Sequence, residues 1–177
     1  MIQPYDPASL AARARRGSGD ALSELYSRFG NALMAVAYRL TGSRDDAEDV
    51  LHDVFLGLPE ALVRYEERGS LESWLKRVTA RVALTHMRSR GRLREVSFND
   101  DVNPMPAPGL DRLVDRLTVQ RAIDALPDSL RIVFILREVE GYSHAEIAEL
   151  LDITSNASEV RLHRALRALR RTIGKDS

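Results

Sequence analysis

The chain has 177 residues, enough for one large domain or two small ones, and its 26 basic and 26 acidic residues leave no net charge from which to predict a partner. Its lack of cysteine excludes disulfides and thiolate metal sites. No apolar run reaches the roughly 20 residues that span a bilayer and the start of the chain lacks a signal-peptide core, so we expect a cytoplasmic protein without membrane insertion.

The first half of the sequence predicts helices. Asp6 and Pro7 form an N-cap and first-turn pair for a short helix that ends at Gly17 and Gly19. Asp20 is the predicted cap of the next helix, whose apolar residues recur at spacings of three and four and therefore share one inward face. That face consists of Leu22, Leu25, Tyr26, Phe29, Leu33, Val36, Ala37 and Leu40.

A third helix is predicted to begin at Ser43, after Gly42. Pro59 lacks an N–H and its ring would collide with the carbonyl of Phe55, so we expect a kink or break near 57–59. The acids of this helix accompany a single base, Arg44, and we expect them to be exposed. They are Asp45, Asp46, Glu48, Asp49 and Asp53.

The residues alone leave two interpretations of these acids open. Acids near a helix N-terminus are favoured by the helix dipole, so they can form a plain solvated face. Asp46, Asp49 and Asp53 also recur at three and four, as a magnesium-dependent phosphohydrolase site would need. No second carboxylate pair is evident and the four histidines are scattered, so the sequence predicts no metal, no cofactor and no catalytic residue.

The next predicted helix is basic. Ser70 is its cap and it runs to about Arg90, before Gly91. Residues 76–94 include seven basic side chains and no acid, and separate acidic and basic surfaces indicate separate partners. Trp74 could stack on a base, but its helical spacing with Leu71 and Val78 favours a place in the core.

Three prolines and several Asn and Asp residues make 96–109 a predicted flexible linker, with Asp100 and Asp101 within it. Apolar spacing then predicts one helix over 110–126 and another from Asp128 to an inward-facing Val139.

The stretch 126–171 predicts a helix-turn-helix. Ser143 and Glu146 form a capping box, and Asp152 occupies the left-handed position of the turn. The second helix begins within 154–156 and carries five arginines and no acid over 161–171, which suits a phosphate-lined major groove. A plain helical hairpin with a solvated arginine face is the alternative.

Four segments, in order along the chain, resemble bacterial sigma-70 RNA polymerase factors of the extracytoplasmic-function group. They are "ALSELYSRFGNALMAVAYRLTGSRDDAEDVLHDVF", "GSLESWLKRVTARVALTHMRSRGR", "ALPDSLRIVFILREVEGYSHAEIAELLDI" and "RLHRALRALR". The resemblance implies an all-α protein with two small helical domains. They are a region-two helical bundle at 1–95 and a region-four helix-turn-helix at 110–177, joined by the linker 96–109.

The resemblance further implies that the protein is an alternative sigma factor, which binds core RNA polymerase and promoter DNA, and that it is not an enzyme. Many relatives are also held by an anti-sigma factor. The acidic helix, from Asp45 to Asp53, would dock on polymerase, and the linker acids would mimic nucleic acid charge. The minus-ten element would be read by Tyr65, Arg68, Ser70, Arg77, Arg81, Thr85 and Arg88. The minus-thirty-five element would be read by Ser155, Asn156, Glu159, Val160, Arg161, His163 and Arg164.

Several positions depart from the family pattern. Pro59 replaces an aromatic residue and Arg81 an asparagine, while Ser158 stands where an apolar residue is usual. Glu159 can accept from a cytosine amine, or it can complete a capping box with Asn156 and touch no base. A stand-alone helix-turn-helix regulator is the alternative function, but it would leave the acidic and basic helices of the first half unexplained.

Overall fold

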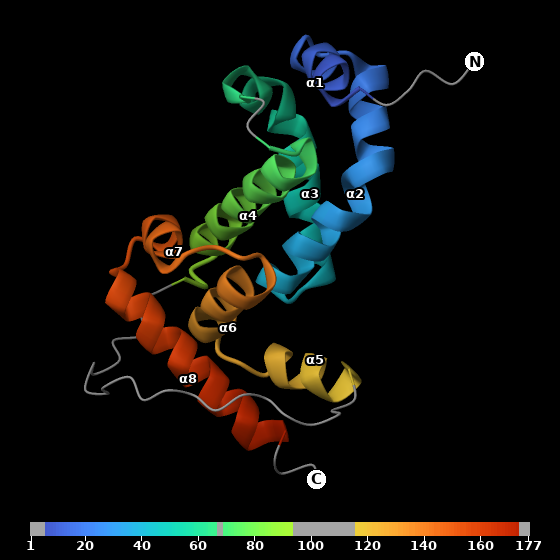
Figure 1. Cartoon of the computed structure of the whole chain (residues 1–177). Helices are drawn as coiled ribbons and strands as arrows, with labels where there is room; N and C mark the ends of the chain where they lie inside the picture. The colour runs from blue at the N-terminus through green and yellow to red at the C-terminus, as the bar shows by residue number, and fades with distance from the viewer. Residues whose placement is uncertain (1–5, 67–68, 94–115, 174–177) are drawn as a thin grey trace. The chain divides into compact units, whose positions relative to one another are not determined.

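The computed structural model describes residues 6–66, 69–93 and 116–173 (Figure 1). Within these ranges all regular structure is helical, which confirms the predicted all-α class. The chain divides into two compact units, Met1–Met87 and Arg88–Ser177. The predicted linker 96–109, with Asp100 and Asp101, lies outside the described residues.

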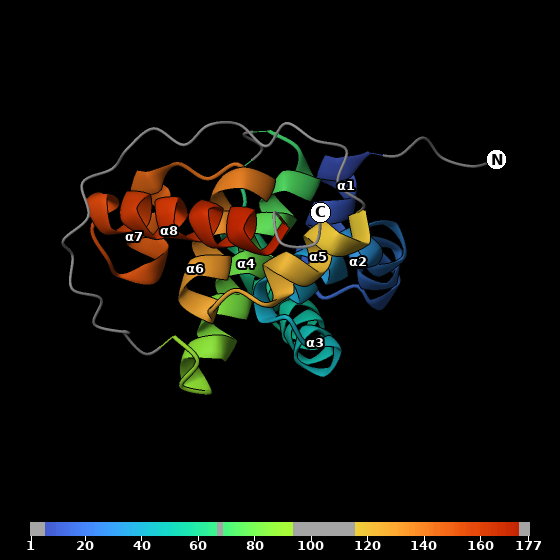
Figure 2. The same ribbon diagram turned by 90° about the horizontal axis from the view of Figure 1, so that it is seen from below.

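The first unit consists of α1 (Pro7–Arg15), α2 (Gly19–Thr41), α3 (Arg44–Ala61), the short 3-10 helix η1 (Leu62–Arg64) and α4 (Leu71–Ser89), whose last two residues belong to the second unit. α2 and α3 lie side by side, and α1 packs against both (Figures 1 and 2). Their facing stripes form the core, because apolar residues at spacings of three and four share one side of a helix. Fully buried members are Leu25, Leu33, Val36, Leu40, Val50 and Leu58.

Three details of this unit differ from the sequence prediction. Ser18, not Asp20, caps α2: its Oγ accepts from the backbone N–H of Ala21 at 3.4 Å, and the helix begins before Asp20. Of the kink or break expected near Pro59, the break is absent: α3 continues as one helix to Ala61, since a proline so near the helix end removes only one hydrogen bond. Tyr26 is 56% exposed instead of inward, and its ring meets that of Phe55 edge-on.

The second unit contains α5 (Arg116–Asp124), α6 (Asp128–Phe134), the π-helical turn η2 (Ile135–Val139), α7 (His144–Leu151) and α8 (Ser155–Ile173). α8 packs against α5, α6 and α7 around a core that includes Ile132, Leu136 and Ile147 (Figure 2). The π turn holds more residues per turn than an α-helix and shifts the side-chain register. Val139, predicted to face inward, is consequently 48% exposed.

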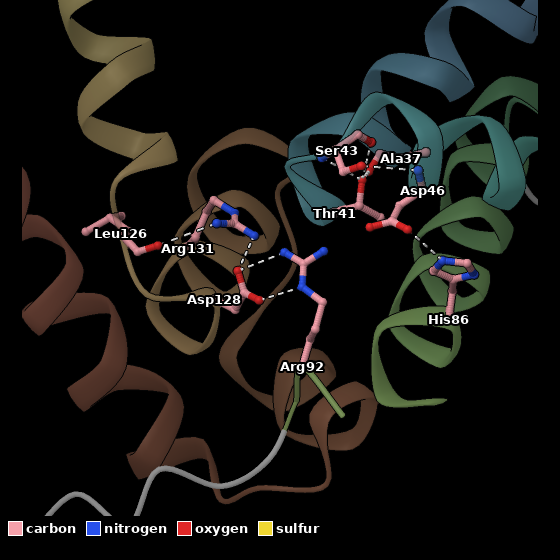
Figure 3. A network of polar contacts seen from close by, with 9 residues as sticks. All are labelled: Ala37, Thr41, Ser43, Asp46, His86, Arg92, Leu126, Asp128 and Arg131. Carbon is pink, nitrogen blue, oxygen red and sulfur yellow. Dashed lines mark hydrogen bonds and ion pairs between the residues drawn. The ribbon is translucent and has the colours of Figure 1, made fainter. Parts of the chain in front are cut away.

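Asp128 anchors the start of α6 by a charged network (Figure 3). Its carboxylate accepts from Arg92 Nε at 2.8 Å and Nη2 at 3.2 Å, and it pairs with the buried Arg131. Arg131 also donates to the carbonyl oxygen of Leu126 at 3.4 Å. Burial by itself raises the pKa of Asp128, but the hydrogen bond from Arg92 and the charges of both arginines outweigh it and lower the pKa below its usual value.

We expect Asp128→Asn to lower the free energy of unfolding of the second unit at pH 7 by about 1 to 3 kcal/mol, the range for hydrogen bonds to charged groups. Because the pKa of Asp128 is lower in the folded state, its contribution is complete above the unfolded-state pKa of about 4 and disappears as the pH falls through the folded-state value. Urea unfolding followed at the amides of α6 and α8 should show the two proteins converging in acid. An equal gap at neutral and acidic pH would contradict this assignment.

Candidate functional site

Between Arg44 and Asp53, the solvent side of α3 carries four exposed acids: Asp45, Glu48, Asp49 and Asp53. The opposite side of the same helix buries Val50, Val54 and Leu58, which fixes the direction of the acids. Arg44 partly offsets their charge, with its Nε 2.9 Å from Glu48 Oε1. The imidazole of His52 lies beside Asp53, with 3.7 Å between His52 Nδ1 and Asp53 Oδ1. The prediction of an exposed acidic surface is therefore confirmed for these four residues.

Asp46 does not share that surface, and its predicted exposure is wrong. Its side chain is 11% exposed, and its Oδ1 lies 3.3 Å from Nε2 of His86, whose side chain is 13% exposed (Figure 3). The backbone N–H of Asp46 donates to Oγ of Ser43 at 3.3 Å. Because α4 covers this position, Asp46 connects α3 to α4 instead of facing a partner.

The three carboxylates considered as a metal site, those of Asp46, Asp49 and Asp53, are not the group that the structure brings together. In the described part of the chain, the group whose possible ligand atoms lie within 4.8 Å of one another is Asp46, Asp49 and His86. The polar contact between the imidazole of His86 and the carboxylate of Asp46 is enough to explain why these two groups lie together. We therefore interpret this group as the joint between α3 and α4.

A groove borders the acidic surface, between α2 and α3. Tyr26, Met34, Leu51 and Phe55 line it, with Arg44, Glu48 and His52 among the polar residues around them. Sequence reasoning missed this groove, because it assigned Tyr26 to the core. The signal was an aromatic residue at the edge of the apolar stripe, where a small rotation of the helix decides between burial and exposure.

Three predicted minus-ten residues lie on one side of α4. Arg77, Arg81 and Thr85 are exposed and recur every four residues, so they follow one another along the helix. Lys76, on a neighbouring side, pairs with Glu72 at 2.8 Å. Arg88 belongs to the second unit, where its Nη2 donates to the carbonyl oxygen of Leu150 at 3.3 Å.

The segment before α4 places two further candidates. Ser70 is the predicted cap: its Oγ accepts from the backbone N–H of Ser73 at 3.1 Å. The half-buried ring of Tyr65 meets the ring of Trp74 edge-on at 5.0 Å. Trp74 thus packs within the unit and is itself half-buried. Arg68 lies outside the described residues.

The helix-turn-helix forms as the sequence predicts. Ser143 and Glu146 make both bonds of the capping box, with Ser143 N–H donating to Glu146 Oε2 at 2.8 Å and Glu146 N–H donating to Ser143 Oγ at 3.2 Å. Asp152 adopts the left-handed conformation at φ 55°. Thr154 caps α8, its Oγ1 accepting from the backbone N–H of Ala157 at 3.0 Å.

That cap rules out one interpretation of the first turn of α8. With Thr154 as the cap, the position that completes a capping box belongs to Ala157, so the pairing of Asn156 with Glu159 is wrong. Ser155, Asn156 and Glu159 are exposed. The next turn presents Arg161, His163 and Arg164 as half-buried side chains.

Val160 is misplaced among the predicted base readers, because it is only 7% exposed. Both α6 and α7 pack against α8, so the buried sector of this helix is wider than a single apolar stripe and includes Val160.

None of the helices in the described part of the chain is long and apolar enough to cross a membrane.

Comparison with known proteins identifies the chain. Residues 25–93 match the family Sigma-70 region 2, and residues 116–169 match Sigma-70, region 4. The ECF RNA polymerase sigma factor SigE of Mycolicibacterium smegmatis is 30% identical over 181 residues, which span 99% of this chain and 70% of that protein. The chain belongs to the extracytoplasmic-function group of sigma-70 factors. It is an alternative sigma factor, which directs transcription from particular promoters.

Other sigma factors and solved structures match nearly the full length of this chain. The RNA polymerase sigma-H factor of Pseudomonas aeruginosa is 26% identical over 96% of this chain and 94% of its own. Among solved structures, CnrH in complex with the cytosolic domain of CnrY has a TM-score of 0.57 and 27% identity, covering 97% of this chain and 99% of that one. Since such relatives extend through the first half, a stand-alone helix-turn-helix regulator does not describe the chain.

We expect Asp46→Ala to lower the free energy of unfolding of the first unit by about 1 to 3 kcal/mol, because it removes a shielded polar contact and leaves the half-buried His86 without its carboxylate. Asp53→Ala, on the same helix but exposed, is the matched control and should change it by less than about 0.5 kcal/mol. Urea unfolding can be followed by the fluorescence of Trp74, the chain's one tryptophan. Equal stability of the two variants would contradict the assignment of Asp46.

Proposed function

We propose that the sigma factor binds core RNA polymerase through the exposed acids of α3. The observation that carries the proposal is the division of this helix into a buried apolar side and an exposed side, which carries four carboxylates between Arg44 and Asp53: Asp45, Glu48, Asp49 and Asp53. Complementary charge speeds encounter and excludes wrong partners. The neighbouring groove, with Tyr26 and Phe55, adds apolar area that charge alone does not supply.

Asp46 has an indirect part in this proposal. It was predicted to contact polymerase, but a carboxylate held against His86 on α4 is not available to a partner. Its contribution is to hold α3 against α4, so that Asp45 and Asp49 on either side keep their direction. Asp46 therefore leaves the set of proposed contact residues.

Promoter opening is proposed to use the exposed side of α4. Arg77, Arg81 and Thr85 form a row of two cations and a hydroxyl, which suits the backbone of an unpaired strand. Tyr65, Arg68 and Ser70 are proposed to hold a flipped base of the minus-ten element. Arg88 is proposed to contact a phosphate. Arg81, in place of asparagine, can bond a phosphate or a guanine edge.

Recognition of the minus-thirty-five element is proposed for α8. Ser155, Asn156 and Glu159 would meet base edges, since the first turn of a reading helix enters the major groove. Arg161, His163 and Arg164 would hold phosphates or bases. Glu159 has no capping duty, and a carboxylate so placed favours a cytosine amine over a phosphate.

The rest of the organisation follows the same proposal. A region-two domain at 1–95 and a region-four domain at 110–177 are joined by the linker 96–109, whose acids would mimic nucleic acid charge in the polymerase channel. The factor would act in the cytoplasm and catalyse no bond change. CnrH was solved in complex with another protein, the cytosolic domain of CnrY. We propose that this sigma factor is also held by a protein partner, and that the partner is an anti-sigma factor.

We expect the combined change Asp49→Lys and Asp53→Lys to weaken binding to core polymerase by about 10- to 100-fold, since like charges across an interface cost several kcal/mol. The combined change Glu138→Lys and Glu149→Lys, at two exposed acids of the second unit, makes an equal charge reversal outside the proposed surface and should bind as the wild type does. Fluorescence anisotropy of the labelled sigma factor, titrated with core polymerase, gives the dissociation constants. Undiminished association of the α3 variant would remove this surface from the polymerase interface.

Arg81→Ala should lower the ratio of open to closed promoter complexes by about 10-fold, which corresponds to the loss of one charged hydrogen bond. Binding of the closed complex should change little, because the proposed partner is the unpaired strand. Permanganate footprinting at saturating holoenzyme measures the opening. Arg16→Ala, an exposed arginine after α1, is the control, and normal melting with Arg81→Ala would exclude its proposed role.

A further inference from the structure

A hydrogen bond joins the two helices of the helix-turn-helix at their N-terminal ends. Nδ1 of His144, the first residue of α7, lies 2.8 Å from Oγ of Ser158, in the first turn of α8. Ser158 is completely buried and His144 is half-buried. A buried hydroxyl without a partner is costly, so this pair of groups is held together.

Both partners are on backbone that is fixed independently. His144 follows Ser143, whose side chain and backbone are tied to Glu146 by the capping box. Ser158 follows the turn capped by Thr154, and its own N–H donates to the carbonyl oxygen of Thr154 at 3.1 Å. The bond therefore connects two rigid helix starts, not two mobile side chains.

Apolar contacts between α7 and α8 are not directional in this way. Ile147 of α7 and Ala165 of α8 are buried apolar residues of the same core, and apolar packing tolerates small slides and rotations. A short hydrogen bond with defined geometry does not. It sets both the separation of the two helix starts and the rotation of α8 about its own axis.

The rotation matters because Ser158 stands next to the exposed side of the reading helix. Glu159 follows it directly, and Ser155 precedes it by one turn. Any rotation of α8 at Ser158 redirects these exposed side chains relative to the body of the domain. An apolar residue, which the family resemblance leads one to expect at this position, would provide volume but no such constraint.

We propose that the His144–Ser158 hydrogen bond is a positioning contact that sets the orientation of α8 and thereby the base preference of the sigma factor at the minus-thirty-five element. The inference rests on the proposed reading role of α8. Neither residue touches DNA in this account. They act through Ser155, Asn156 and Glu159.

An amide can take the place of either ring nitrogen atom of His144, Nδ1 or Nε2, and this provides a matched pair of variants. In His144→Asn the amide occupies the place of Nδ1 and can keep the bond to Ser158, whereas in His144→Gln it lies near the place of Nε2 and cannot. Both variants are polar and uncharged. Ser158→Ala removes the hydroxyl from the other side.

The test uses holoenzyme reconstituted from core polymerase and the full-length sigma factor, with a pool of randomised duplexes as the probe. We expect the wild type and His144→Asn to enrich the same minus-thirty-five motif. With His144→Gln and Ser158→Ala, discrimination between the best and the second-best base should fall by about 3- to 10-fold, the equivalent of one hydrogen bond. The salt dependence of binding should not change, since no phosphate contact is lost.

The outcomes separate the inference from its foundation. A wild type that enriches no motif overturns the reading role of α8 and this inference together. A motif that Ser158→Ala and His144→Gln share unchanged with the wild type overturns this inference alone, as does a loss in His144→Asn equal to that in His144→Gln. Circular dichroism establishes that each variant is folded, and the two His144 variants decide the question if Ser158→Ala is not.

Discussion

Each helix that we propose to bind a partner has to bury one side and keep the other side charged. Burying a leucine or valine side chain contributes about 1.5 to 3 kcal/mol, whereas an exposed ion pair contributes about 0 to 1 kcal/mol. Burial therefore decides how a helix is rotated, and charged residues take the positions that remain. In α3 this places Val50 and Leu58 inside and Asp49 and Asp53 outside. In α4 it exposes the row that begins at Arg77.

The same constraint explains which predicted site residues are not on a surface. A second neighbouring helix widens the buried sector of a helix beyond its apolar stripe. Asp46 lies in such a sector because α4 covers it, and a carboxylate there needs a partner, which His86 provides. Val160 lies in another, between the neighbours of α8. The residues that hold a proposed binding surface in place are thus distinct from those that form it.

Local signals in the sequence were sufficient for most of the fold. The Ser43 cap, the Ser143–Glu146 box and the left-handed Asp152 depend on neighbours a few residues away, and all three were predicted. The contact of Asp46 with His86 joins positions 40 residues apart, and no periodicity within either helix indicates it. The predictions that Tyr26 and Val139 face inward were wrong for a related reason. The exposure of Tyr26 and the π turn that ends at Val139 depend on packing around the helix and not on its own pattern.

Two separate surfaces, one for core polymerase and one for promoter DNA, are proposed to make this chain a dissociable promoter-specificity subunit. Gel filtration of the purified sigma factor mixed with core RNA polymerase, followed by transcription from a pool of promoter fragments with the complex that elutes, tests this proposal. We expect the sigma factor to elute with core at equal stoichiometry and the complex to initiate at particular fragments where core alone does not. A sigma factor that binds duplex DNA but elutes apart from core would contradict it.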